Sequence, residues 1–277
     1  MPVDWRALDA DEREAQMNPR MAVGNDRAEA RLSDYAERSR ATRQRLPATY
    51  DIRYGDGPKA TLDVFTPPGP GPHPIFAFVH GGYWRALDKD DHSFVVAPAV
   101  AAGFAGLVLN YDLCPAVTLD DILAELRAFM RWLARDGAQH GLDLDRLTMA
   151  GHSAGAHLTA MLMHDPGGRD LPPVRWAGLL SGIYEPEAIL DISINEDVRL
   201  DAEAAARHDA LRRPPRGEPR IEVIVGGDEP PAWIGQSEAY ATMVRALGHD
   251  VAFRIVEGAD HFTLLDHPIV PSLQHRP

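Results

Sequence analysis

The sequence predicts a single α/β domain built on a mostly parallel sheet. Two apolar runs, at 75–79 and 104–110, have the length and continuous hydrophobicity of strands buried on both faces. Three later runs, at 146–150, 221–225 and 251–256, alternate with helix-forming segments, as strands and crossover helices do in a parallel sheet. A chain of 277 residues with 45% hydrophobic content is long enough to form one such domain around a large core.

The first part of the chain has a different character. Residues 1–48 are rich in Arg, Glu, Asp and Ala and predict a helical N-terminal arm, which either covers the mouth of a site or is solvated. Segments 50–54 and 60–65 predict an antiparallel pair joined by a Gly-Asp-Gly turn. The main domain is expected over 49–277, and 183–219 is either a small cap or a surface excursion.

The clearest helix is predicted over 118–133. Apolar residues recur there at helical spacing, which indicates a face packed on the core. Thr118 and Asp121 suit the N-terminus of this helix, as the capping residue and an acid in the first turn.

The segment 151–155 reads Gly-His-Ser-Ala-Gly and lies between a strand-like run and a helix-forming run. In that context a sharp turn strains the backbone of Ser153 and presents its hydroxyl beyond the sheet edge, while the flanking glycines let strand and helix pass closely. Ser153 is therefore the predicted nucleophile. The alternative is a chance occurrence of the pattern in a loop.

A second motif, His-Gly-Gly-Tyr-Trp at 80–84, follows the buried strand at 75–79. Adjacent glycines after such a strand can turn backbone N–H groups toward a ligand. Gly81 and Gly82 are the candidate donors from this loop, and the amide of Ala154, directly after the nucleophile, is the other candidate donor for an oxyanion. The alternative is a plain turn.

The order nucleophile, acid, histidine locates the remaining catalytic candidates. Two later strand-like runs are each followed by a polar turn, which contains Asp228 in one case and His261 in the other. Ligands bind at that edge of open α/β sheets. His261 is predicted to take the serine proton and Asp228 to orient the imidazole. Glu229 is the alternative acid and His267 the alternative base.

Several segments together resemble the kynurenine formamidase (arylformamidase) branch of the α/β-hydrolases, which is related to the hormone-sensitive-lipase-like esterases. They are HGGYW at 80–84, YDLCP at 111–115 and GHSAGAH at 151–157. The Tyr-Trp extension and the Gly-Asp-Glu setting at 227–229 favour the formamidase branch. The resemblance covers about 50–266.

This resemblance implies an α/β-hydrolase fold with an eight-stranded, mostly parallel sheet and helices on both faces. It implies a triad and an oxyanion hole formed by Ser153, Asp228 and His261 and by Gly81, Gly82 and Ala154. Lipase-like relatives usually carry a basic residue where this chain has Asp112, which argues against the lipase-like reading.

The resemblance further implies hydrolysis of an aryl formamide such as N-formylkynurenine, a step of tryptophan catabolism. Tyr83 and Trp84 are predicted to bind the aromatic leaving group, although Trp84 could instead only pack the loop. A broad-range carboxylesterase is the first alternative, and a non-catalytic ligand-binding protein of the same fold is the second. No cofactor or metal is assigned, because His152 and His157 lack metal-site spacing.

Composition restricts the partners. The net charge of −13 argues against nucleic acid or an anionic membrane, and the expected partner is a small-molecule aryl formamide or ester. A homodimer is compatible with the sequence. The single cysteine, Cys114, is expected to be a buried thiol and fits a reducing compartment. Without an apolar leader or a membrane-length run, the sequence predicts a cytoplasmic protein.

Overall fold

A computed structural model describes residues 3–168, 170–267 and 269 and contains one eight-stranded sheet. The strand order is β1-β2-β4-β3-β5-β6-β7-β8. The strands are β1 (Ala48–Arg53), β2 (Thr61–Phe65), β3 (His73–Val79), β4 (Ala105–Leu109), β5 (Leu142–His152), β6 (Val174–Leu180), β7 (Arg220–Gly226) and β8 (Val251–Val256). Only β2 runs against its neighbours within this sheet, so the predicted mostly parallel α/β sheet is confirmed.

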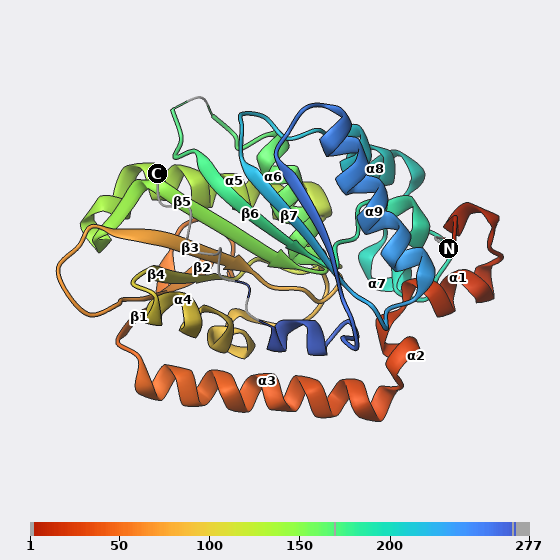
Figure 1. Cartoon of the computed structure of the whole chain (residues 1–277), viewed down its shortest axis with the longest axis horizontal. Helices are drawn as coiled ribbons and strands as arrows, with labels where there is room; N and C mark the ends of the chain where they lie inside the picture. Colours follow the sequence, from red (N-terminus) through yellow and green to blue (C-terminus); the bar gives the residue numbers. More distant parts are fainter. Residues whose placement is uncertain (1–2, 169, 268, 270–277) are drawn as a thin grey trace.

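Helices cover both faces of the sheet (Figure 1). They are α1 (Ala10–Met17), α2 (Pro19–Val23), α3 (Asn25–Arg45), α4 (Ala97–Ala101), α5 (Leu119–Asp136), α6 (Ala154–His164), α7 (Asn195–Val198), α8 (Ala202–Arg207) and α9 (Pro231–Ala246). The long α3 and the short α4 lie on one face, and α5, α6 and α9 lie on the other.

The two-residue period of β3 divides its side chains between two cores. Ile75, Ala77 and Val79 join the cluster that contains the α5, α6 and α9 residues. Phe76 and Phe78 join the opposite cluster, with residues of α3 and α4. All five side chains are fully buried, which explains why the run is continuously apolar rather than alternating.

Helix α5 begins as the sequence predicts. Thr118 is the N-cap, and its side chain and that of Asp121 accept each other's backbone N–H groups in a capping box. The apolar face of α5 is buried against the sheet. The helix continues to Asp136, three residues beyond the predicted end.

The N-terminal arm is helical and packs on the main domain. Helices α1, α2 and α3 all lie within it, and the indole of Trp5 donates to Glu185 at 3.2 Å. The backbone N–H of Ala232, in α9, donates to the side chain of Gln16 at 3.0 Å. The arm is therefore attached both to α9 and to the segment after β6. No helix in the described ranges is long and apolar enough to cross a bilayer.

Candidate active site

Ser153 occupies a strained turn between β5 and α6. Its φ of 57° and ψ of −119° lie outside the regions that L residues favour. A side chain at Gly155 would have its Cβ 2.0 Å from the carbonyl oxygen of Val79, and one at Gly151 would lie 2.2 Å from the oxygen of Gly155. Both glycines are thus required by close backbone approach, as the sequence motif predicts.

The Gly-Gly loop after β3 lies directly beside this turn. A Cβ built on Gly81 would be 3.1 Å from the Cβ of Ser153. Gly82 has a φ of 109°, and it lines the same cavity as Ser153. Among the described residues, the amides of Gly82 and Ala154 donate to no protein acceptor. They are free to bind an oxyanion.

His80, directly before the two glycines, holds the Gly-Gly loop in place through buried contacts. Its ring is fully buried, hydrogen-bonds Asn110 at 3.1 Å through Nε2 and stacks on Tyr111 with centroids 4.3 Å apart. The Tyr111 hydroxyl donates to the His80 carbonyl at 2.9 Å. Burial lowers the pKa of His80, so the ring is a neutral structural group rather than an acid–base catalyst.

Glu229 is the carboxylate that hydrogen-bonds to His261. The Nδ1 of His261 donates to Oε2 of Glu229 at 2.7 Å, and both side chains are buried. The prediction that Asp228 holds this histidine is wrong, because Asp228 lies exposed in the tight turn after β7. The side chain of Asp228 faces solvent, whereas the side chain of the next residue, Glu229, faces inward. His267, the alternative base, is exposed and does not line the cavity.

Ser181 holds the other oxygen of Glu229, and sequence reasoning missed it. The Ser181 hydroxyl and the backbone N–H of Gly226, at 2.8 Å, both donate to Oε1 of Glu229. Ser181 follows β6 and has a φ of 46°. The only sequence signal was a serine at the carboxyl end of a strand that neighbours β7. Trp233 adds an edge contact to the His261 ring at 4.9 Å.

His152, the variable residue of the serine motif, contacts His261. Its Nε2 donates to the backbone carbonyl of His261 at 2.9 Å, and the ring centroids are 4.6 Å apart. Burial, with a smaller contribution from His261, lowers the pKa of His152 well below the ordinary value. A neutral His152 therefore positions the backbone of His261.

The two aromatic residues after the glycines have structural roles. Trp84 is fully buried and does not line the cavity, so its predicted contact with substrate is wrong. Its ring packs edge-on to His157 at 5.1 Å. Tyr83 does line the cavity, but its hydroxyl donates to the carbonyl of Met17 in the arm. Cys114 is buried, which raises the pKa of its thiol to about 11.

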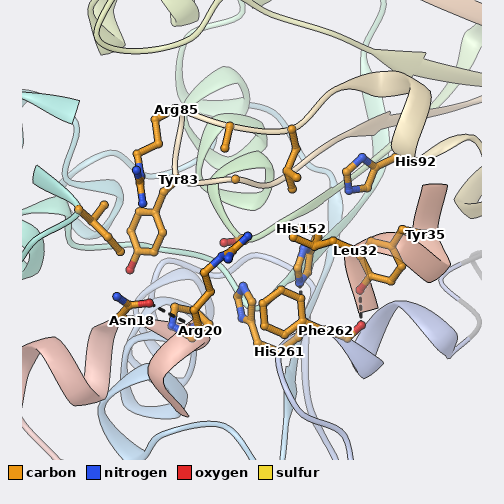
Figure 2. Close-up of a pocket in the computed structure, with 16 residues that line it drawn as sticks. Asn18, Arg20, Leu32, Tyr35, Tyr83, Arg85, His92, His152, His261 and Phe262 are labelled. Atoms are coloured by element: carbon orange, nitrogen blue, oxygen red, sulfur yellow. Dashed lines mark hydrogen bonds between the residues drawn. The ribbon is translucent and has the colours of Figure 1, made fainter. Parts of the chain in front are cut away.

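The cavity beside Ser153 is bounded by the turns that carry Ser153 and His261, by the Gly-Gly loop and by the arm (Figure 2). Its lining consists of Asn18, Pro19, Arg20, Leu32, Tyr35, Gly82, Tyr83, Arg85, Ala86, Leu87, His92, His152, Ser153, Ile194, His261 and Phe262. The arm thus covers part of the site. The segment 183–219 contributes only Ile194 to this wall.

Known proteins are similar to this chain over most of its length. The kynurenine formamidase of Danio rerio is 30% identical over 279 residues, which is 95% of this chain and 92% of that protein. The kynurenine formamidase of Drosophila melanogaster is 28% identical over 79% of this chain and 76% of its own length. The BD-FAE family matches residues 62–168.

Solved structures agree on the fold. A protein from Silicibacter sp. TM1040 with a provisional thioesterase assignment has a TM-score of 0.76 at 28% identity, over 89% of this chain and 91% of its own. An esterase from Pyrobaculum calidifontis has a TM-score of 0.69 at 18% identity over 86% of each chain, which shows the shared fold alone.

The sheet order and these relatives define a hydrolase with the α/β-hydrolase fold. The identity to the Danio rerio protein extends over almost the full length of both chains. The chain therefore belongs to the kynurenine formamidase family.

Proposed function

We propose that this protein is a serine hydrolase that cleaves an aryl formamide such as N-formylkynurenine into the arylamine and formate. The observation that carries the proposal is the buried hydrogen bond between His261 and Glu229 at the cavity where the strained Ser153 lies. Full-length similarity to kynurenine formamidases supports the choice of substrate.

In the first step the Oγ of Ser153 attacks the formyl carbon while Nε2 of His261 accepts the hydroxyl proton. The carbonyl oxygen becomes an anion and is stabilised by the amides of Ala154 and of the loop residues Gly81 and Gly82. His261 then gives its proton to the departing nitrogen, the C–N bond breaks, and a formyl ester of Ser153 remains.

In the second step water attacks the formyl ester. His261 accepts a proton from the water, the bond to Oγ breaks, and the proton returns to Ser153 as formate leaves. Glu229 stays ionised throughout. It fixes the imidazole tautomer and stabilises the imidazolium that forms in each step.

A broad-range carboxylesterase remains the second candidate, because the same machinery cleaves esters. Similarity to esterases such as LipQ of Mycobacterium tuberculosis, 30% identical over 41% of this chain, favours this candidate. Anilides are harder to cleave than aryl esters, since the nitrogen must be protonated as it leaves. The two functions therefore differ in both acyl and leaving-group preference.

The test compares N-formyl and N-acetyl anilides of the same arylamine with butyrate esters. We expect kcat/KM for the formyl anilide to exceed that for the acetyl anilide by more than ~100-fold, because an acyl site that fits a hydrogen clashes with a methyl group. The Ser153→Ala variant serves as the control and should lack turnover. Hydrolysis of butyrate esters without hydrolysis of formyl anilides would instead identify a general esterase.

A further inference from the structure

The charge on the cavity wall has the opposite sign to that of the whole chain. The chain carries a net charge of −13. Of the sixteen residues that line the cavity, the only ones with a full charge are Arg20 and Arg85, and no lining residue is Asp or Glu. Local groups determine which ligand a site attracts, so this wall favours an anion.

The two arginines differ in what neutralises them. Arg85 forms an ion pair with Asp197, so its charge is already compensated. The guanidinium of Arg20 has no hydrogen bond or ion pair with any residue that the structure describes. Arg20 is exposed to solvent and lines the cavity, and Figure 2 shows its side chain extending from the arm between Tyr83 and His152 in this view.

The backbone that carries Arg20 is held firmly. Met17 is fully buried, its carbonyl accepts the Tyr83 hydroxyl, and its sulfur accepts from Gln236 at 3.4 Å. Asn18 caps the following helix by accepting the N–H of Arg20 at 3.2 Å. The arginine is thus placed opposite the catalytic groups by contacts that its own side chain does not make.

We propose that Arg20 is a specificity-determining residue that binds a carboxylate on the leaving group of the substrate. This inference rests on the proposed function and identifies the preferred substrates as anionic aryl formamides. The acyl part of a formamide carries only a hydrogen, so an anionic group that meets Arg20 must belong to the arylamine. A guanidinium suits this role because its planar donors match both oxygens of a carboxylate.

The proposal is tested with two ortho-formamidophenyl ketones that differ only at the end of the side chain. One ends in a carboxylate, the other in a primary carboxamide. For the wild type, Arg20→Gln and the control Arg40→Gln, the measurement is the ratio of kcat/KM for the two compounds. Arg40 is an exposed arginine of α3 that does not line the cavity, so its substitution removes the same charge from the same arm.

We expect Arg20→Gln to lower this ratio about tenfold or more, mainly through KM for the carboxylate compound, because a charge-assisted contact is lost. Arg40→Gln should leave the ratio within about twofold, since Arg40 does not line the cavity and solvent screens its charge from a bound substrate. The thermal unfolding midpoint of Arg20→Gln should equal that of the wild type. An unchanged ratio in Arg20→Gln, or an equal loss on both compounds, overturns the proposal.

Failure of the proposed function has a separate signature. If the wild type cleaves neither formamide, the same ratio is measured with aryl acetates that bear a carboxylate or a carboxamide on the ring. Comparison between variants cancels the intrinsic reactivity of each ester. A ratio that falls in Arg20→Gln then supports the role of Arg20 although the formamidase activity is absent, and an unchanged ratio overturns that role as well.

Discussion

Glu229 is a buried carboxylate whose two oxygens are both occupied. One accepts from Nδ1 of His261, and the other accepts from the Ser181 hydroxyl and the N–H of Gly226. Burying an ionised carboxylate is costly unless such donors replace water. The three donors lie at or just beyond the carboxyl ends of three different strands, β6, β7 and β8, so the orientation of Glu229 depends on the assembled sheet edge.

At this residue scale, the adjacent acids provide a matched pair of variants. We expect Glu229→Gln to lower kcat by roughly 10⁴, because the amide no longer holds the productive tautomer of the imidazole. Asp228→Asn should leave kcat within about threefold, since exposed substitutions away from the site have small effects. Steady-state kinetics on a formyl anilide measures both. A larger loss in Asp228→Asn than in Glu229→Gln would contradict the role of Glu229.

At the scale of an element, helix α5 carries a partly buried carboxyl group, that of Glu125, whose pKa is shifted by its surroundings. Oε2 of Glu125 accepts the backbone N–H of Asp112 at 2.9 Å. Burial, together with the nearby carboxylate of Asp112, raises the pKa of Glu125 to about 7. Because the pKa is higher in the folded protein, the protonated carboxyl contributes stability that is complete below about pH 4.5 and is lost as pH rises through about 7.

Replacing this group with its neutral isostere removes that pH dependence. We expect Glu125→Gln to increase the free energy of unfolding by about 1 kcal/mol at pH 8.5, after allowance for solvent screening of a half-exposed group. At pH 4.5 the two proteins should be equally stable. Urea unfolding at both pH values measures the difference. A stabilisation that is the same at both pH values would show that ionisation is not its cause.

At the scale of the whole molecule, the arm and the glycine loop are joined through one contact. The hydroxyl of Tyr83, directly after the Gly-Gly loop, donates to the carbonyl of Met17, the last residue of α1. Met17 packs in the main core cluster with Trp233. The arm that covers the cavity and the Gly-Gly loop therefore pack together as one unit. Because Arg20 belongs to the arm, local opening of the arm would also displace Arg20.

This coupling is measurable by hydrogen exchange. We expect Tyr83→Phe to speed amide exchange in residues 10–24 about tenfold, because it leaves a buried carbonyl unsatisfied and favours local opening. Exchange in the central strands should not change. Tyr50→Phe is the control, since it removes a comparable bond to the carbonyl of Arg43 at an exposed position. Equal exchange in the wild type and Tyr83→Phe would show that this bond does not hold the arm.

The sequence by itself determined the sheet, the serine turn and the position of His261 beyond the last strand. These features are encoded locally. Continuous apolar runs specify strands buried on both faces, and Gly151 and Gly155 specify a close approach that no other residue permits. The position of His261 after the last strand follows from chain order alone, because the carboxyl ends of parallel strands share one edge.

Only the tertiary structure decided which neighbouring side chains meet. Asp228 and Glu229 carry the same group one residue apart, and the turn after β7 sends one to solvent and the other to the donors of Ser181 and Gly226. Trp84 is buried because the loop passes through residues with φ of 52° and 58°, a backbone path that no local pattern predicts. The arm covers the cavity, and Arg20 lines it, through packing between segments far apart in the sequence. Such contacts depend on geometry that forms only when the whole chain has folded.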